Sequence, residues 1–414
     1  MDIYLVGGAV RDKLLDRTAR EQDWVVVGGS AEELEALGYR RVGKSFPVFL
    51  HPETNEEYAL ARTETKTGPG YHGFDVYAGT DVTLEEDLQR RDLTVNAIAA
   101  DDNGKLIDPW GGQADIEARV LRHVSAAFRE DPLRVLRVAR FAASLHDKGF
   151  TVAPETQQLL QEISASGELD ALSPERVWKE TEKALLTSRP DVYLQTLRDC
   201  GALQTVFPEI DALFGVPQPE KWHPEIDTGV HTLLTLQLAA ELSTSIDVRF
   251  AAMVHDLGKG TSDPQYWPSH RDHERRGVKL IEQLCARAGV PNRSRDLAQH
   301  VALYHTHTHR AMQLRPDTVL RMLEAVDAFR RPERFDDFLL ACEADARGRT
   351  GLEKIPYHQA NIMRAAFSAA LDVDNSALQA QGLKGPEFGA ALKQARVTAI
   401  TASLQLSRGN EADQ

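Results

Sequence analysis

The chain has 414 residues, of which 42% are hydrophobic and 27% charged, which is enough for several globular cores and roughly two to four domains. Its formal net charge of −14 excludes a uniformly basic surface, so a nucleic acid would have to bind a restricted part of it. The sequence has no apolar stretch near the ~20 residues of a membrane span, no signal-peptide pattern and only three widely spaced cysteines. We therefore expect a cytoplasmic protein without a membrane partner.

The first predicted unit is a strand, a glycine turn and a helix. Residues 3–6 predict a short buried strand, and Gly7-Gly8 would let the backbone approach a phosphate. The helix expected over residues 9–15 has free N–H groups at its start, which favour an anion, and would place Arg11 near a triphosphate. Taken alone, the glycine pair is more often only a turn.

Two carboxylates, Glu21 and Asp23, lead into the apolar run 24–27. Residues i and i+2 of a strand project from the same face, so both acids can reach one cluster of divalent ions. Two-metal nucleotidyl transfer uses such a pair. Taken alone, the acids are more often a solvated strand end, but their place in one strand–helix–strand unit favours a nucleotide transferase.

Further strand segments are predicted at residues 41–50, 57–62 and 106–109, and the Gly-rich stretch 65–73 is typical of a mobile loop beside a site. After about residue 125 the pattern is helical almost throughout, and residues 407–414 predict a frayed polar tail.

Two arginine-rich segments suit an anionic ligand. Arg90-Arg91-Asp92 precedes Asn96, and this set can clamp phosphate and ribose oxygens. Glu130-Asp131-Pro132 begins a helix along which Arg134, Arg137 and Arg140 follow at i+3 steps. The alternative for both segments is a solvent-facing, ion-paired helix.

A second group of candidate residues lies in the helical half. His231 falls near the start of one predicted helix, and His255-Asp256 ends a largely apolar one. Adjacent imidazole and carboxylate groups can bind one divalent ion when a distant histidine completes the set. A buried His-Asp pair is often only a hydrogen-bonded couple, but several histidines follow downstream: His270, His273, His305, His307 and His309. Not all of these can be ligands, and we expect half of the alternating His-Thr run to face solvent.

The order of these motifs resembles the class II CCA-adding tRNA nucleotidyltransferases. The resemblance rests on segments 7–12, 90–97, 108–112 and 130–134 together with the acid pair, and it continues through 173–180 into the His-Asp segment, as in bacterial multifunctional CCA proteins. It implies template-independent addition of C, C and A to tRNA from CTP and ATP with Mg²⁺ at Glu21 and Asp23. The implied nucleotide-binding residues are Gly8, Arg11, Arg91, Asp131, Arg134, Arg137 and Arg140.

The chemistry of Asp131 and Arg134 agrees with that implication. Cytosine and adenine both present an exocyclic amine beside a ring-nitrogen acceptor, so a carboxylate and a guanidinium can pair with either base. Uracil and guanine offer the carboxylate a carbonyl instead, and mismatched buried polar groups can discriminate by factors of roughly 10⁴.

The segment with His231, His255 and Asp256 is similar to HD-superfamily phosphohydrolases, which implies that these residues hold a second divalent metal, with Ni²⁺ as a candidate, and that Asp345 is a weaker candidate ligand. The resemblance also implies hydrolysis of 2′,3′-cyclic phosphates, 2′-nucleotides or simple phosphate esters by a metal-activated water.

One residue departs from the family pattern. The acid pair is ordinarily Asp-x-Asp, whereas this chain has Glu21 in the first place, and the added methylene moves the carboxylate by about 1 Å in a site where Mg²⁺ demands near-octahedral geometry. Glu57 and Glu64 are candidates for a third acid, each more readily explained as structural.

We expect an α+β chain with a polymerase-beta-like head of mixed sheet and helices, followed by all-α neck, body and HD domains. The expected boundaries are 1–140 for the head, 141–225 for the helical neck and body, 226–330 for the HD domain and 331–414 for a C-terminal helical region. We expect a monomer or a weak homo-oligomer. Two alternatives remain: a poly(A) polymerase, and a tRNA-binding phosphohydrolase whose transferase has lapsed through Glu21.

Overall fold

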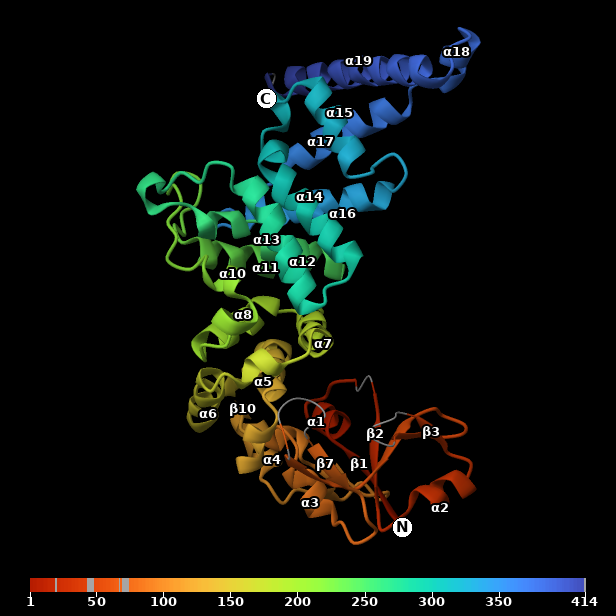
Figure 1. The fold of residues 1–414 in the computed structure, drawn as a ribbon, viewed down its shortest axis with the longest axis vertical. Coiled ribbons are helices and arrows are strands. Elements are labelled where there is room, and N and C mark those ends of the chain that lie inside the picture. The colour runs from red at the N-terminus through yellow and green to blue at the C-terminus, as the bar shows by residue number, and fades with distance from the viewer. Residues whose placement is uncertain (19–20, 43–47, 67, 69–73, 413–414) are drawn as a thin grey trace. The chain divides into compact units, whose positions relative to one another are not determined.

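The computed structural model describes residues 1–18, 21–42, 48–66, 68 and 74–412 (Figure 1). The chain forms two compact units, one made of Met1–Ala184 with Val192–Val206 and the other of Leu185–Asp191 with Phe207–Gln414. The four-domain division stays a prediction. Among the described residues, none of the helices has the length and apolar character needed to cross a membrane.

The first unit is built on a seven-stranded mixed sheet in the order β3-β4-β5-β2-β1-β8-β9. Within it β2 and β5 are parallel and the other pairs are antiparallel. This mixed sheet, followed by helices, confirms the predicted fold class. The strands are β1 (Asp2–Val6), β2 (Asp23–Val27), β3 (Arg40–Val42), β4 (Val48–Leu50), β5 (Glu57–Leu60), β6 (Thr63–Lys66), β7 (Phe74–Tyr77), β8 (Ala99–Ala100), β9 (Leu106–Ile107), β10 (Val120–Leu121) and β11 (Thr151–Val152).

Two strand predictions are refined by the structure. The segment predicted over 41–50 contains two antiparallel strands, β3 and β4, and its middle, 43–47, lies outside the described residues. The Gly-rich stretch 65–73 begins inside β6, and most of the predicted loop also lies outside them.

Alternation along β2 gives the sheet an apolar layer on each face. Val25 packs in a core with Val6, Leu88 and Ala97, whereas its neighbour Val26 packs in another. Successive strand residues point to opposite faces, so the β-branched run 25–27 is explained by burial on both sides of the sheet.

Helices form the rest of the chain. They are α1 (Gly8–Leu14), α2 (Ala31–Ala36), α3 (Leu84–Gln89), α4 (Gly112–Ala118), α5 (Leu133–Leu145), α6 (Pro154–Ala165), α7 (Pro174–Leu185), α8 (Pro190–Asp199), α9 (Leu203–Val206), α10 (Pro208–Asp211), α11 (Thr228–Leu242), α12 (Ile246–Val254), α13 (His273–Ala288), α14 (Asn292–His309), α15 (Pro316–Ala325), α16 (Pro332–Arg347), α17 (His358–Leu371), α18 (Asn375–Ala380) and α19 (Gly385–Ala412).

The predicted polar tail is wrong for residues 407–412, which continue helix α19. The hydroxyl of Ser407 donates to the carbonyl of Ser403 one turn back, and the Arg408 guanidinium donates to the carbonyl of Met312. These contacts stabilise a helical segment that its polar composition alone would predict to be frayed.

Candidate functional sites

The glycine turn after β1 lies against an arginine. Gly7 has φ +71°, a value that side-chain-bearing residues rarely adopt, and a Cβ atom added there would lie 2.9 Å from Nη1 of Arg91. Gly8 then begins α1. The turn therefore needs glycine for its backbone conformation and for the close approach of Arg91, one of the predicted nucleotide-binding residues.

Arg11 and Arg137 belong to one polar network. Nη1 of Arg11 donates to Oδ1 of Asn96 at 2.6 Å, and Nδ2 of Asn96 donates to Oδ1 of Asp92 at 3.0 Å. Arg137 donates from Nε to Oδ2 of Asp92 at 2.7 Å. Burial raises the pKa of Asp92, but the charge of Arg137 and these hydrogen bonds outweigh it and hold the pKa well below its ordinary value. The network thus joins residues from α1, η1 (Thr94–Asn96) and α5.

Arg140, the third arginine of the stripe on α5, is held by another carboxylate. Its Nε lies 2.5 Å from Oε2 of Glu180, and its guanidinium carbon lies 4.1 Å from the centre of the Phe141 ring. The helix weighed from the sequence is thus ion-paired through Arg137 and Arg140, with partners from other segments of the same unit. It is not solvent-facing, because most of α5 is buried.

The acid pair lies at the start of β2. Asp23 is the first residue of the strand and pairs in register with Val6 and Glu57, Glu21 precedes the strand, and both acids are exposed. Desolvation and the charge of Glu21 raise the pKa of Asp23, and the charge of Arg91 opposes that rise. Asp23, Glu21 and Arg91 therefore share one electrostatic neighbourhood.

The two candidates for a third acid differ in their surroundings. Glu57 neighbours Asp23 across the parallel β2–β5 pair. Glu64 accepts from Arg62 at 2.9 Å and from Arg90 at 3.0 Å, so its carboxylate is engaged in ion pairs.

Asp131 and Arg134 both have protein partners at the start of α5. Oδ1 of Asp131 accepts from the backbone N–H of Leu133 at 3.1 Å, and Oδ2 accepts from Nη2 of Arg176 at 2.8 Å. Arg134 is buried and donates to the carbonyl oxygens of Ala127 and Arg90, at 3.0 and 2.5 Å. The roles predicted for this pair stay predictions, and Arg176, from segment 173–180, is a neighbour of Asp131 that was not among the predicted site residues.

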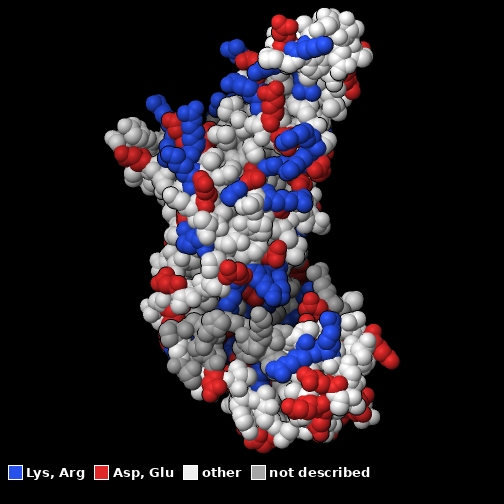
Figure 2. All heavy atoms as spheres, turned by 45° about the vertical axis from the view of Figure 1, so that its right-hand side comes forward, with Lys and Arg blue, Asp and Glu red and all other residues white. Residues whose placement is uncertain are grey.

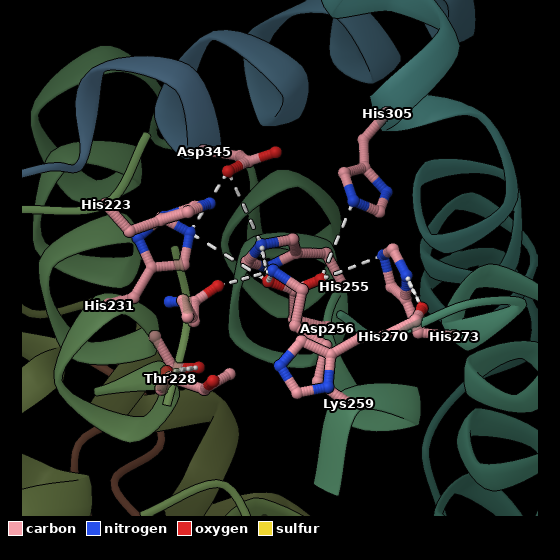
Figure 3. Close-up of polar contacts among 12 residues, drawn as sticks. His223, Thr228, His231, His255, Asp256, Lys259, His270, His273, His305 and Asp345 are labelled. Atoms are coloured by element: carbon pink, nitrogen blue, oxygen red, sulfur yellow. Dashed lines mark hydrogen bonds and ion pairs between the residues drawn. The ribbon is translucent and has the colours of Figure 1, made fainter. Parts of the chain in front are cut away.

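The HD segment forms a buried cluster of histidines and carboxylates (Figure 3). His231 from α11, His255 after α12 and Asp345 from α16 are almost fully buried and hold ligand atoms within 4.8 Å of one another. Nε2 of His231 lies 3.1 Å from Oδ1 of Asp345, and Nε2 of His255 lies 3.6 Å from the same oxygen. The structure thus brings together the predicted ligands His231 and His255 with the weaker candidate Asp345.

Asp256 connects this group to a second one. Its Oδ2 lies 3.2 Å from Nε2 of His255. Its Oδ1 lies 3.5 Å from Nε2 of His273 and 3.6 Å from Nε2 of His305. Asp256, His273 and His305 form the second group of potential ligands, so the Asp256 carboxylate bridges the two.

The fold fixes the orientation of these imidazoles. In three of the histidines, Nδ1 lies 2.8 to 2.9 Å from a backbone carbonyl oxygen of a residue three or four positions earlier. The pairs are His255 with Ala252, His273 with His270, and His305 with Val301. A carbonyl oxygen only accepts, so each Nδ1 carries the hydrogen and each Nε2 faces the carboxylates.

These residues fit a divalent metal. Nε2 of His255, Nε2 of His273 and Oδ1 of Asp256 are buried without a hydrogen-bond partner. Burial lowers the pKa of His255, yet Asp256 and Asp345 raise it to about 10, which reports concentrated negative charge that a cation would balance. Imidazole nitrogens and carboxylate oxygens are ordinary ligands of transition metals.

Sequence reasoning missed a second layer around His231. The Glu225 side chain is buried, and its Oε1 lies 3.0 Å from Nδ1 of His231 and 3.1 Å from Nδ1 of His223. The two histidine contacts outweigh burial and lower the pKa of Glu225. A carboxylate that accepts from Nδ1 directs Nε2 of His231 at the cluster. Its only signal in the sequence is the His-Pro-Glu segment shortly before His231.

We expect Glu225→Ala to weaken the affinity for Mn²⁺ or Ni²⁺ by about 10- to 100-fold, because the orientation of His231 would be lost. Glu225→Gln keeps an accepting oxygen and should lose less. Isothermal titration calorimetry on the full chain measures both. Equal affinity of Glu225→Ala and wild type, with unchanged circular dichroism, would contradict this role.

The remaining histidines lie around the cluster. His309, one turn after His305 on α14, places Nε2 2.6 Å from Oδ2 of Asp345, and His307 is not in either group of ligands. The alternating run is helical, so that among its histidines only His305 and His309, four residues apart, share a face. His270 is buried, and desolvation together with the charge of Lys259 lowers its pKa.

Profiles of three families match the chain. The Poly A polymerase head domain matches residues 3–122, the family described as probable RNA and SrmB-binding site of polymerase A matches 149–214, and the HD domain matches 228–333.

Similarity to individual proteins extends over nearly the whole chain. The Multifunctional CCA protein of Thioalkalivibrio sulfidiphilus is 60% identical over 97% of this chain and 98% of its own length. That of Vibrio vulnificus is 59% identical over 98% of this chain and 99% of its own. Among solved structures, the Thermotoga maritima CCA-adding enzyme complexed with tRNA has a TM-score of 0.63 at 16% identity, covering 98% of this chain and 91% of that one, which supports the fold.

The polymerase-type head and the HD domain together define a nucleotidyltransferase that carries a metal-dependent phosphohydrolase domain. With relatives of this identity and coverage, the chain belongs to the multifunctional CCA protein family.

Proposed function

We propose that this protein adds and repairs the 3′-terminal CCA of tRNA, using CTP and ATP. Two observations together support the proposal. The chain is similar to a multifunctional CCA protein along 97% of its length, and Arg91 lies close to the glycine turn and acts electrostatically on Asp23 of the acid pair. The phosphates would contact Arg11, Arg91, Arg137 and Arg140 beside the turn at Gly8.

Glu21 and Asp23 would hold Mg²⁺, since Mg²⁺ prefers carboxylate oxygens. When bound, the metal would activate the tRNA 3′-hydroxyl and neutralise the pyrophosphate leaving group. Arg91, close to Asp23, would orient the phosphates and limit the repulsion between the acids and the nucleotide.

Base selection would rest on Asp131 and Arg134, which the fold holds at the start of α5. Binding of C or A would require Asp131 to exchange or share its contact with Arg176. On the face drawn in Figure 2, Lys and Arg lie among Asp and Glu.

The first test is incubation of the purified chain with tRNA lacking its CCA end, Mg²⁺ and each labelled nucleotide in turn. Growth by C, C and A followed by arrest supports the proposal. Long A-tracts would instead indicate a poly(A) polymerase, and no incorporation with intact phosphoesterase activity would indicate a lapsed transferase caused by Glu21.

We expect Asp131→Ala to relax nucleotide choice. The preference for CTP over UTP should fall by about 10²-fold, because the carboxylate that rejects a carbonyl is removed. Single-turnover incorporation on tRNA ending in CC or C, with each nucleotide alone, measures the ratio. A variant that is slower but equally selective would place selection elsewhere.

We propose that the HD cluster hydrolyses phosphoesters such as 2′,3′-cyclic phosphates, 2′-nucleotides and simple phosphomonoesters. His231, His255, Asp256 and Asp345 would hold the metal, with Ni²⁺ as a candidate, and His273 and His305 would complete a second position. A bound metal would supply a nucleophilic water. Removal of damaged ends by this centre would precede their rebuilding by the head. Release of phosphate from adenosine 2′-phosphate, with metals added singly to chelator-treated protein, tests this activity.

A further inference from the structure

A buried carboxylate on α3 holds two consecutive arginines. The Asp87 side chain is fully buried, and each of its oxygens serves a different arginine. Oδ1 accepts from Nη2 of Arg90 at 2.6 Å, and Oδ2 accepts from Nη2 of Arg91 at 3.1 Å. Burial raises the pKa of Asp87, but the charges of Arg90 and Arg91 outweigh it and lower the pKa, so the carboxylate is ionised. Asp87 is thus one anion shared by two guanidinium groups.

The Oδ2 side fixes Arg91 against the glycine turn. Both Nε and Nη2 of Arg91 face Oδ2 of Asp87, at 3.4 and 3.1 Å. A guanidinium is planar, so these two contacts set the direction of the remaining nitrogen, Nη1. Nη1 lies 3.5 Å from the carbonyl oxygen of Asn96 and 2.9 Å from the place that a Cβ atom would take at Gly7. Asp87 therefore directs Nη1 of Arg91 at the turn beside which the phosphates are proposed to bind.

The Oδ1 side fixes Arg90, and the backbone of Arg90 holds another arginine. Nε of Arg90 also lies 3.1 Å from Oδ1 of Asp87, and its Nη1 donates to Oε1 of Glu64 at 3.0 Å. The carbonyl oxygen of Arg90 accepts from Nη2 of Arg134 at 2.5 Å. Arg90 therefore connects the buried carboxylate to Arg134, the proposed base-selecting residue at the start of α5.

Stability alone is a weak reason to bury such a group. The cost of desolvating a buried ion pair offsets most of its Coulomb attraction, and apolar side chains of similar volume often stabilise a fold equally well. An arginine that binds phosphate gains from a fixed guanidinium plane, because less freedom is lost when the ligand arrives. The shared carboxylate supplies that fixed plane for Arg91.

We propose that Asp87 is a positioning residue for nucleotide addition, which orients Arg91 toward the triphosphate. Through the backbone of Arg90 it also holds Arg134 in place for the base. This inference rests on the CCA-adding function proposed above, and it assigns a role in that reaction to a buried residue.

Asp87→Asn tests the role, because an amide keeps the shape of the side chain but has one oxygen and so serves one arginine at a time. In addition of labelled nucleotide to tRNA lacking CCA, KM for CTP should rise about tenfold while kcat stays within about threefold. The preference for CTP over UTP should fall about threefold, because Arg134 is displaced. Asp87→Glu keeps the charge and should recover part of both losses.

Asp115→Asn is the matched control. Asp115 is another buried carboxylate of the same unit, and it accepts from Arg122 and Thr94. Its variant should lower the thermal unfolding midpoint, as Asp87→Asn does, but leave KM for CTP and the preference over UTP at wild-type values. A loss of kcat by Asp87→Asn that is equal for both nucleotides, with KM unchanged, would reduce Asp87 to a structural role and overturn the inference. Unchanged kinetics would overturn it as well.

A separate measurement covers the case in which the wild-type protein adds no nucleotide and the proposed CCA addition fails. Calorimetric binding of CTP to the full chain in the presence of Mg²⁺ then decides the inference. About tenfold weaker binding by Asp87→Asn than by the wild-type protein supports the positioning role. Equal binding by the two proteins, or no binding by the wild-type protein, excludes it.

Discussion

Asp23→Asn should abolish nucleotide incorporation almost completely, by about 10³-fold or more in kcat/KM. The amide keeps the shape of the side chain but removes the charge that a divalent ion needs, and a loss of about 4 kcal/mol in transition-state stabilisation corresponds to that factor. The measurement is single-turnover addition of labelled CTP to tRNA lacking CCA, with Mg²⁺ varied from low to high concentration. Saturation should shift to higher Mg²⁺ as well.

Glu21→Asp provides the matched control, because it restores the shorter acid without changing charge. Its activity should equal or exceed that of the wild-type protein if the methylene of Glu21 only displaces the carboxylate. Hydrolysis at the HD cluster should be unchanged in both variants, which separates loss of a metal ligand from misfolding. Full incorporation by Asp23→Asn would remove Asp23 from the reaction and leave Glu57, its neighbour in register, as the acid to test next.

Strand and helix-start signals are local, so they predicted strands in the first part of the chain and helices after about residue 125, whereas the mixed sheet was expected from the family resemblance. The same logic predicted His255-Asp256 at the end of an apolar helix, where the structure places it. It failed at residues 407–412, since the contact of Arg408 with Met312, in the short 3-10 helix Ala311–Gln313, has no local signature.

Sites assembled from distant segments were only partly predictable. His273 and His305 meet Asp256, and Asp345 meets His255, from three different helices. A run of histidines does not reveal which ones face inward until the helix phase is known. Glu225 was missed for a related reason. A carboxylate that orients a ligand has no fixed spacing from it, so its role is visible only from the 3.0 Å contact with His231.

Asp256→Asn should have the second large effect, a loss of about 10³-fold in phosphoester hydrolysis with CCA addition unchanged. The Asp256 carboxylate contacts histidines of both groups, with Oδ2 near His255 and Oδ1 near His273 and His305. The amide would present one oxygen and one N–H donor, so one of the two groups would lose its anionic partner.

Metal content distinguishes the possible causes of that loss. Elemental analysis of Asp256→Asn after loading with Ni²⁺ should find less metal than in the wild-type chain. The control variant is His307→Asn, because His307 lies on the same helix as His305 but outside both groups. It should retain the wild-type metal content and rate of hydrolysis. Loss of CCA addition together with hydrolysis would point to misfolding. Wild-type hydrolysis by Asp256→Asn would mean that the bridging carboxylate is structural, and that the buried charge around His255 serves to hold α11, α12 and α16 together rather than a metal.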